Sequence, residues 1–216
     1  MKTPEEMRDF FRSIPSKKKK ENPYWVFDRE NTRIDTAVWS LTPGVGQKPF
    51  KLETMIPLLT SVRNFFRSYY ESFQSEAQVL CVSQKDGATL NKLGIPILTQ
   101  GEIGPFDASV MVLPQDNSGG TSKISESFWQ YQIVSEGIVP IVRIHSHHVL
   151  DPYQSVTDYS TLNSGTMEMV LGKILDDPIS VCYWLDVPGT DIKAQTFVAK
   201  QKDDGKFETV PVWFHK

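Results

Sequence analysis

The sequence predicts a mixed α/β domain in which a central β-sheet is flanked by at least three helices. The chain has 216 residues, of which 39% are apolar and 23% are charged, so it can bury one full-sized core. One long segment has apolar residues at helical spacing, and several short apolar segments are bounded by turn residues. Segments of both kinds in one chain indicate a sheet covered by helices.

Residues 1–50 form a separate N-terminal part in this prediction. A short amphipathic helix is expected to begin at Thr3 and to stop at Pro15. We interpret the run Lys17–Lys20 as a solvated linker rather than as a contact for nucleic acid or acidic lipid. The rest of this part is expected to pack as an arm on the main domain, residues 51–216, without contributing chemistry.

The clearest helix is predicted for residues 57–74, opened by Pro57. Its apolar residues recur at helical spacing and form one broad face. They are Leu58, Leu59, Val62, Phe65, Phe66, Tyr69, Tyr70 and Phe73. An aromatic stripe of this kind is typical of a core, so we expect no ligand there.

Strands are predicted from short apolar segments that end at turn residues. They cover residues 76–83, 95–99, 109–113, 138–145, 167–174, 179–187, 192–199 and 208–214. Lys85-Asp86-Gly87 indicates a turn, and residues 114–120 a polar loop. Two further helices are expected, at residues 125–136 and from Ser155 to about residue 163.

Cysteine use, charge and hydropathy limit where the protein is expected to work. Cys81 and Cys182 lie in strand-like apolar segments, so we expect buried thiols rather than a disulfide, as in a reducing compartment. The net charge of −3 gives no general reason to expect binding to nucleic acid or to a membrane surface. No apolar segment approaches the length of a membrane span, and the N-terminus lacks a signal-peptide core. These observations predict a soluble, cytoplasmic protein.

The most informative stretch runs from His145 to Asp158. His145 and His147 end a predicted strand, and because side chains alternate along a strand, both imidazoles lie on one side. Asp158, in the first turn of the next predicted helix, would complete a set of two histidines and one aspartate. Three protein ligands with an open fourth position are typical of catalytic zinc. The sequence therefore predicts a Zn²⁺ site.

Such a site indicates hydrolytic chemistry. Zinc lowers the pKa of a bound water to about 7, which makes hydroxide available at neutral pH. A hydrolase also needs a general base and a donor for the developing oxyanion. Ser155 is the natural donor, and the base has to come from upstream. The alternative interpretation, histidines that are merely solvated or satisfied in a core, is disfavoured because His-x-His and Ser-x-x-Asp occur together at this spacing.

This part of the chain resembles the JAMM (MPN-plus) zinc metalloprotease family, in particular its bacterial and phage members. The family signature is an upstream glutamate, then His-x-His-Pro, then Ser-x-x-Asp. Here His145-Ser146-His147 is followed by seven residues, His148 included, and then by Ser155-Val156-Thr157-Asp158. In the family a long helix leads into a strand that starts with the catalytic glutamate, and helix 57–74 followed by Glu76 is similar.

The resemblance extends over about residues 55–200 and implies a fold and an activity. The fold is an MPN-like (cytidine-deaminase-like) mixed central sheet flanked by helices. The activity is that of a zinc peptidase or isopeptidase that hydrolyses an amide bond in a protein or peptide, with ubiquitin-like proteins among the candidate substrates. The resemblance implies His145, His147 and Asp158 as zinc ligands, Glu76 as general base and Ser155 as oxyanion stabiliser.

The sequence departs from the family pattern in two places. His148 stands where the family has proline, and because adjacent side chains on a strand point opposite ways, we expect it to face a loop or the substrate rather than to be a fourth ligand. The strand after Glu76 lacks the glycines that usually follow the glutamate. Glu102 therefore remains the second candidate for the general base.

Two other functions are compatible with parts of this pattern. An MPN-type scaffold or binding module would share the fold and have a metal site with little or no hydrolysis, although such members usually lack the ligands that are present here. Zinc-dependent deamination of a nucleobase would need a Cys-x-x-Cys pair, and the sequence contains none. The sequence leaves the oligomeric state open.

Overall fold

The structure is a computed structural model that describes residues 52–103, 106–118, 120–125, 133, 136–153, 155, 167–185 and 196–212. Its helices are the 3₁₀-helix η1 (Leu52–Met55), α2 (Ile56–Phe73) and α3 (Gln84–Lys92). Its strands are β1 (Gln78–Ser83), β2 (Ile97–Ile103), β3 (Phe106–Met111), β4 (Gln115–Ser118), β5 (Thr121–Ile124), β6 (Val142–Ser146), β7 (Met167–Gly172), β8 (Ser180–Leu185), β9 (Thr196–Gln201) and β10 (Phe207–Val212). The described part is mixed α/β, as the sequence predicts.

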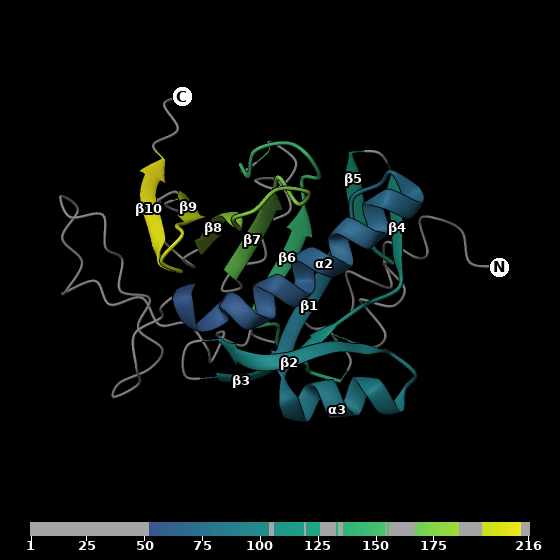
Figure 1. Ribbon diagram of the computed structural model, residues 1–216. Coiled ribbons are helices and arrows are strands. Elements are labelled where there is room, and N and C mark those ends of the chain that lie inside the picture. The colour runs from purple at the N-terminus through teal and green to yellow at the C-terminus, as the bar shows by residue number, and fades with distance from the viewer. Residues whose placement is uncertain are drawn as a thin grey trace, which may run out of the picture.

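Eight of these strands form one sheet in the order β10-β9-β8-β7-β6-β1-β3-β2, and β4 pairs with β5 in a separate hairpin (Figure 1). β6 and β7 are parallel, whereas the other neighbours in the large sheet are antiparallel. A parallel pair needs a crossover connection of a dozen or more residues. Here it spans residues 147–166, so the predicted motif from His147 to Asp158 lies in the crossover that starts at the end of β6.

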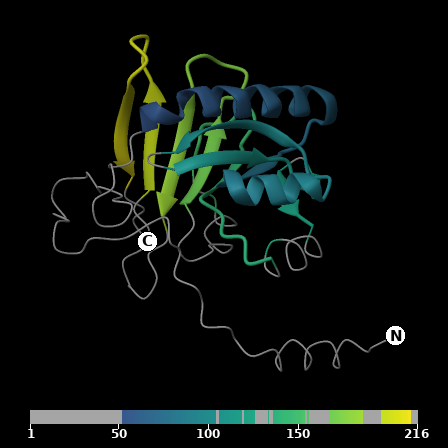
Figure 2. The same ribbon diagram turned by 90° about the horizontal axis from the view of Figure 1, so that it is seen from below.

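Helix α2 covers one face of the large sheet (Figure 2). Its buried residues are Leu58, Leu59, Val62 and Phe66, which belong to the main apolar core. The helix is followed by Gln74, whose φ of 53° lies in the left-handed region and whose N–H donates to Tyr70 O at 2.8 Å. The predicted helix 57–74 is confirmed within one residue at each end, except that Phe73 is 64% exposed instead of buried.

Helix α3 lies on the other face of the sheet, on the opposite side of β2 and β3 from α2 (Figure 2). The prediction of a turn at Lys85-Asp86-Gly87 is wrong, because these residues lie inside α3. Ser83 caps the helix by accepting the Asp86 N–H at 3.1 Å. Gly87 looks like a turn residue but is needed for packing, since a Cβ there would collide with the side chain of Ser109.

The prediction of a polar loop at residues 114–120 is also wrong. Residues Gln115–Ser118 and Thr121–Ile124 pair as the β4–β5 hairpin. The strand residues are mostly polar, so the alternation of apolar side chains that reveals other strands is absent here. The hairpin is held instead by side-chain hydrogen bonds to β1 and α2, which local sequence patterns do not report.

The other predicted strands are confirmed with shifted ends. β6 begins at Val142, after Pro140, rather than at residue 138, and it ends at Ser146. Cys81 and Cys182 are buried free thiols, as predicted, and burial raises the pKa of the Cys81 thiol. The Cys81 thiol therefore stays protonated and is not placed for thiolate chemistry.

Several predictions fall outside the described residues. These are the N-terminal helix and lysine run in residues 1–50, most of the helix at 125–136, and the helix from Ser155 to residue 163 apart from Ser155 itself. The described part contains two α-helices, and the other predicted helices lie mostly outside it. The prediction of at least three helices therefore stays untested. Among the residues that the structure describes, no helix is both long and apolar enough to cross a membrane.

Candidate functional site

The register between β1 and β6 brings Glu76 close to the His-x-His pair. Gln78 on β1 pairs directly with His145 on β6. Continuing this antiparallel register by two residues sets Glu76 opposite His147. Because side chains alternate across a strand and paired residues share a face, all four side chains lie on the same face of the sheet. All four are less than a tenth exposed.

Ser146, the residue between the two histidines, anchors this register. Its N–H donates to Ala77 O at 3.0 Å, and its Oγ accepts the Ala77 N–H at 3.1 Å. Ala77 is the neighbour of Glu76, so these bonds fix the backbone that carries the carboxylate. In the sequence Ser146 is only a spacer in the motif, and no local signal predicts this role.

The two imidazoles of the predicted zinc site lie side by side. The ring centroids of His145 and His147 are 5.2 Å apart. The His147 ring also meets the edge of Tyr153 at 4.6 Å, which limits its movement. Rings at this separation on one face of a strand can both direct a nitrogen at one ion at the 2.0–2.1 Å of zinc–imidazole bonds. The histidine part of the donor set therefore fits zinc.

His148 lies in the turn after β6, with a φ of 42°. The prediction of a loop position is confirmed, but the argument from strand alternation is wrong, because β6 ends at Ser146 and the left-handed residue changes the chain direction. The ring is buried against Tyr70, with centroids 4.8 Å apart, and its Nε2 is 3.9 Å from Glu76 Oε1. Burial, and then the charge of His147, lower the pKa of His148. A lowered pKa favours the neutral imidazole in its contact with Glu76.

The turn that carries His147 and His148 is held by backbone bonds to β7 and to the residues after it. His147 N–H donates to Leu171 O at 2.9 Å, and Ile174 N–H donates to His148 O at 2.9 Å. The backbone of Leu150, Asp151 and Pro152 also lies so close to Gly172 that a Cβ at this position would collide with it. The position of the histidines therefore depends on the β7–β8 turn as well as on β6.

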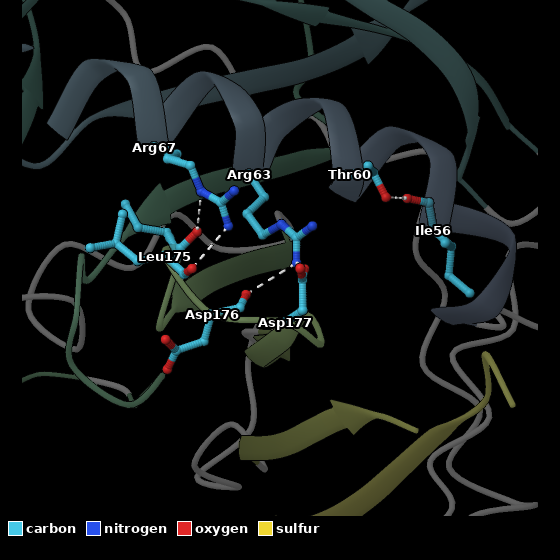
Figure 3. A network of polar contacts seen from close by, with 8 residues as sticks. Ile56, Thr60, Arg63, Arg67, Leu175, Asp176 and Asp177 are labelled. Atoms are coloured by element: carbon cyan, nitrogen blue, oxygen red, sulfur yellow. Dashed lines mark hydrogen bonds and ion pairs between the residues drawn. The ribbon is translucent and has the colours of Figure 1, made fainter. Parts of the chain in front are cut away.

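Two arginines of α2 hold the β7–β8 turn by hydrogen bonds and an ion pair (Figure 3). Arg67 donates from Nε to Ile174 O and from Nη2 to Leu175 O, both at 3.1 Å. Arg63 donates to Asp176 O at 3.2 Å and pairs with the Asp177 carboxylate at 2.5 Å. Arg67 and His148 thus bind opposite sides of the Ile174 residue, which links α2 to the histidine turn.

The third predicted ligand, Asp158, lies outside the described residues. Ser155 is described and half-buried. Among the described residues, no group of three or more histidine, cysteine, aspartate or glutamate side chains is arranged to hold a metal ion. The predicted set has only His145 and His147 in that part of the chain, so the assignment of Asp158 and Ser155 remains a prediction.

Glu102, the second candidate for the general base, lies far from the histidines. It pairs with Asp107 on β3, whose neighbour Ala108 pairs with Ser83 at the end of β1. This puts Glu102 roughly 25 Å from Glu76 along the strand direction, at 3.3 Å per residue. The Glu102 side chain is exposed, whereas Glu76 is 8% exposed. The geometry favours Glu76.

An ion pair on the histidine face was not predicted from the sequence. Arg143 lies two residues before His145 on β6 and donates from Nε to Glu168 Oε2 at 2.6 Å. Glu168 on β7 is fully buried and is the strand partner of Arg143. The sequence does show one charged residue in each of these two apolar strands. Only the parallel register of β6 and β7, however, brings Arg143 and Glu168 together.

No protein-family model matches this chain, and no curated protein matches it either.

Proposed function

We propose that the protein is a zinc-dependent peptidase or isopeptidase with an MPN-like fold. The observation that supports the proposal is the register of β1 on β6, in which Gln78 pairs with His145. Extended by two residues, this register sets Glu76 opposite His147 and on the face of His145, although the glutamate is distant in sequence. A buried carboxylate beside two buried imidazoles is the arrangement that metal-assisted hydrolysis needs. The order of α2, then Glu76 two residues before β1, supports the MPN-like assignment.

In this proposal His145, His147 and Asp158 would hold the zinc ion. When bound, zinc would lower the pKa of a water to about 7 and polarise the scissile carbonyl. The burial of both imidazoles and the low exposure of the site keep bulk water away from the reacting atoms. Tyr153 restrains the His147 ring and so preserves the orientation of one donor nitrogen.

Glu76 is the proposed general base. It takes a proton from the attacking water and passes it to the leaving amine, which accounts for both proton transfers of amide hydrolysis. Its neighbour Ala77 is bonded to Ser146 through both backbone groups, so the backbone that carries the carboxylate is held beside the histidine strand before substrate binds. Ser155 is the proposed donor to the oxyanion of the tetrahedral intermediate.

The first test is the metal content of the purified full chain. We expect close to one zinc per chain in the wild type and loss of most of it in His147→Ala. His215→Ala is the matched control, because His215 is the one histidine outside the cluster, and it should keep the metal. No zinc in the wild type, or equal zinc in both variants, would contradict the proposal.

The second test separates hydrolysis from metal binding. Glu76→Gln should keep zinc and lose about 10²–10⁴-fold in the rate of amide hydrolysis, the usual contribution of a general base. Glu102→Gln should change neither quantity. Substrates are a peptide library and conjugates of ubiquitin-like proteins. A wild type that binds zinc and cleaves none of them would instead indicate the scaffold function.

A further inference from the structure

A side-chain amide completes the hydrogen bonding at the start of β1. β1 lies between β6 and β3 in the sheet. β3 ends at Met111, which pairs with Leu80, so Gln78 lies beyond the end of that strand. The backbone N–H and C=O of Gln78 on this side therefore need a different partner.

Gln115 of β4 is that partner. Gln78 N–H donates to Gln115 Oε1 at 2.8 Å, and Gln115 Nε2 donates to Gln78 O at 3.0 Å. One carboxamide thus makes the two bonds that a strand residue would make. It is itself fixed, because Nε2 also donates to Leu113 O at 3.2 Å and Ser122 Oγ donates to Oε1 at 3.0 Å. The side chain is therefore a rigid support for β1.

The β4–β5 hairpin that carries Gln115 is also tied to α2. Asn117 Nδ2 donates to the hydroxyl of Tyr69 at 2.8 Å. The next helix residue, Tyr70, packs its ring on His148. The hairpin is thus linked to α2, and α2 to His148, whose Nε2 is 3.9 Å from Glu76 Oε1.

We propose that Gln115 is a positioning residue for Glu76. It fixes the backbone of Gln78, and with Ser146 on the other side it sets where the carboxylate lies relative to His147. This inference rests on the proposed function, in which Glu76 is the general base. A base works only within hydrogen-bond reach of its proton, and a misplacement of about 1 Å can cost on the order of 100-fold in rate. Within the described residues, the side-chain hydrogen bonds of Gln115 are made with Gln78, Leu113 and Ser122.

The test compares Gln115→Ala with Gln100→Ala in the full chain. Gln100 is the control, because it is a glutamine of β2 that also makes a side-chain hydrogen bond, to Ser109 at 3.0 Å, although it is exposed whereas Gln115 is half-buried. For Gln115→Ala we expect kcat to fall roughly 10–100-fold, with KM within about twofold and zinc content unchanged. Hydrogen exchange at the Gln78 N–H should accelerate by about tenfold. Gln100→Ala should alter none of these.

A second variant keeps the test valid if Gln115→Ala does not fold. Gln115→Glu has the same shape and still accepts the Gln78 N–H, but at neutral pH its carboxylate cannot donate to Gln78 O and Leu113 O and repels both, so its kcat should fall below that of the wild type and of Gln100→Ala. Equal losses of kcat in the Gln115 and Gln100 variants, or full kcat with fast exchange at Gln78, would overturn the positioning role. If the wild type hydrolyses nothing, the proposed function fails by itself. Hydrogen exchange at the Gln78 N–H then tests by itself whether Gln115 holds β1. An unchanged exchange rate in Gln115→Ala would overturn that claim.

Discussion

The two faces of the large sheet bury very different side chains. On the face under α2, the central strands and the adjoining Ala77 bury mainly apolar residues, with Ser146 of β6 as a polar exception. The apolar ones are Ala77, Val79, Cys81, Val142, Ile144, Met167, Met169, Leu171 and Val181. On the opposite face, the same four strands carry Gln78, Leu80, Arg143, His145, Glu168, Val170, Cys182 and Trp184, all of them buried or half-buried. The alternation along each strand thus separates a mainly apolar face from one that buries polar and charged side chains among apolar ones.

This difference indicates that one face mainly stabilises the fold and that the other carries the functional groups. Apolar burial contributes about 25 cal/mol per Å², whereas burying a polar group stabilises nothing unless it is hydrogen-bonded. The α2 face therefore supplies most of the folding free energy. The histidine face keeps charged and polar groups out of water at a cost, and departures of this kind from good core composition are expected at functional sites.

The largest change in stability should come from the α2 face. Phe66 is 1% exposed and packs within the main core. Phe66→Ala should lower the free energy of unfolding by about 3–5 kcal/mol, because it removes apolar contacts and leaves a cavity. Denaturant unfolding measures this loss. A loss below about 1 kcal/mol would show that α2 does not supply the folding free energy assigned to it.

A smaller loss is expected when the buried ion pair on the histidine face is broken. Glu168→Ala leaves Arg143 without its carboxylate partner, and removing one member of such a pair costs about 3–5 kcal/mol. Here we expect about 2–3 kcal/mol, because the Arg143 side chain is 17% exposed and can reach water.

The combined variant Arg143→Met with Glu168→Leu separates the charge from the packing. It should be close to the wild type in unfolding free energy, or more stable, because no charge stays buried. A combined variant as unstable as Glu168→Ala would mean that the ion pair is a net stabiliser. The two faces would then contribute to folding in the same way.

The third effect tests the close approach of α3 to the histidine face. Alanine is the better helix former by about 1 kcal/mol, so Gly87→Ala would stabilise an exposed helix. Here the added Cβ meets Ser109, with Oγ at 2.6 Å, and we expect a net loss of about 1–2 kcal/mol. Gly87→Ala combined with Ser109→Gly should recover most of it. Thermal unfolding of both variants measures the difference, and a more stable Gly87→Ala would contradict the packing argument.

The same contrast explains what could be predicted from the sequence. Helix α2 was predicted because its apolar residues recur at helical spacing over consecutive turns of one short segment. The shared face of His145 and His147 was predicted because strand alternation is equally local. Helix α3 was missed because Lys85-Asp86-Gly87 has the composition of a turn. A glycine is needed at position 87 because a Cβ there would collide with Ser109 on β3, which is distant in sequence.

The parts of the site that depend on distant pairing were harder to predict. The position of Glu76 follows from the register of β1 on β6, and a shift of one residue would turn its side chain to the other face. Polar residues at 76 and 78 did alternate at the start of an apolar strand, so a signal existed. The roles of Gln115 and Ser146 had no such signal, because both act through backbone groups of another strand.

The smallest effect is expected at the largest side chain of the histidine face. Trp184 is 1% exposed, and among the described residues its Nε1 has no hydrogen-bond acceptor. A buried donor without an acceptor costs about 1–3 kcal/mol. Trp184→Phe removes this donor together with part of a ring, so the two effects oppose each other and the free energy of unfolding should change by less than about 1 kcal/mol. A loss of the size expected for Phe66→Ala would show that side-chain packing outweighs the cost of unpaired polar groups on both faces. The two faces would then not differ in their contribution to stability.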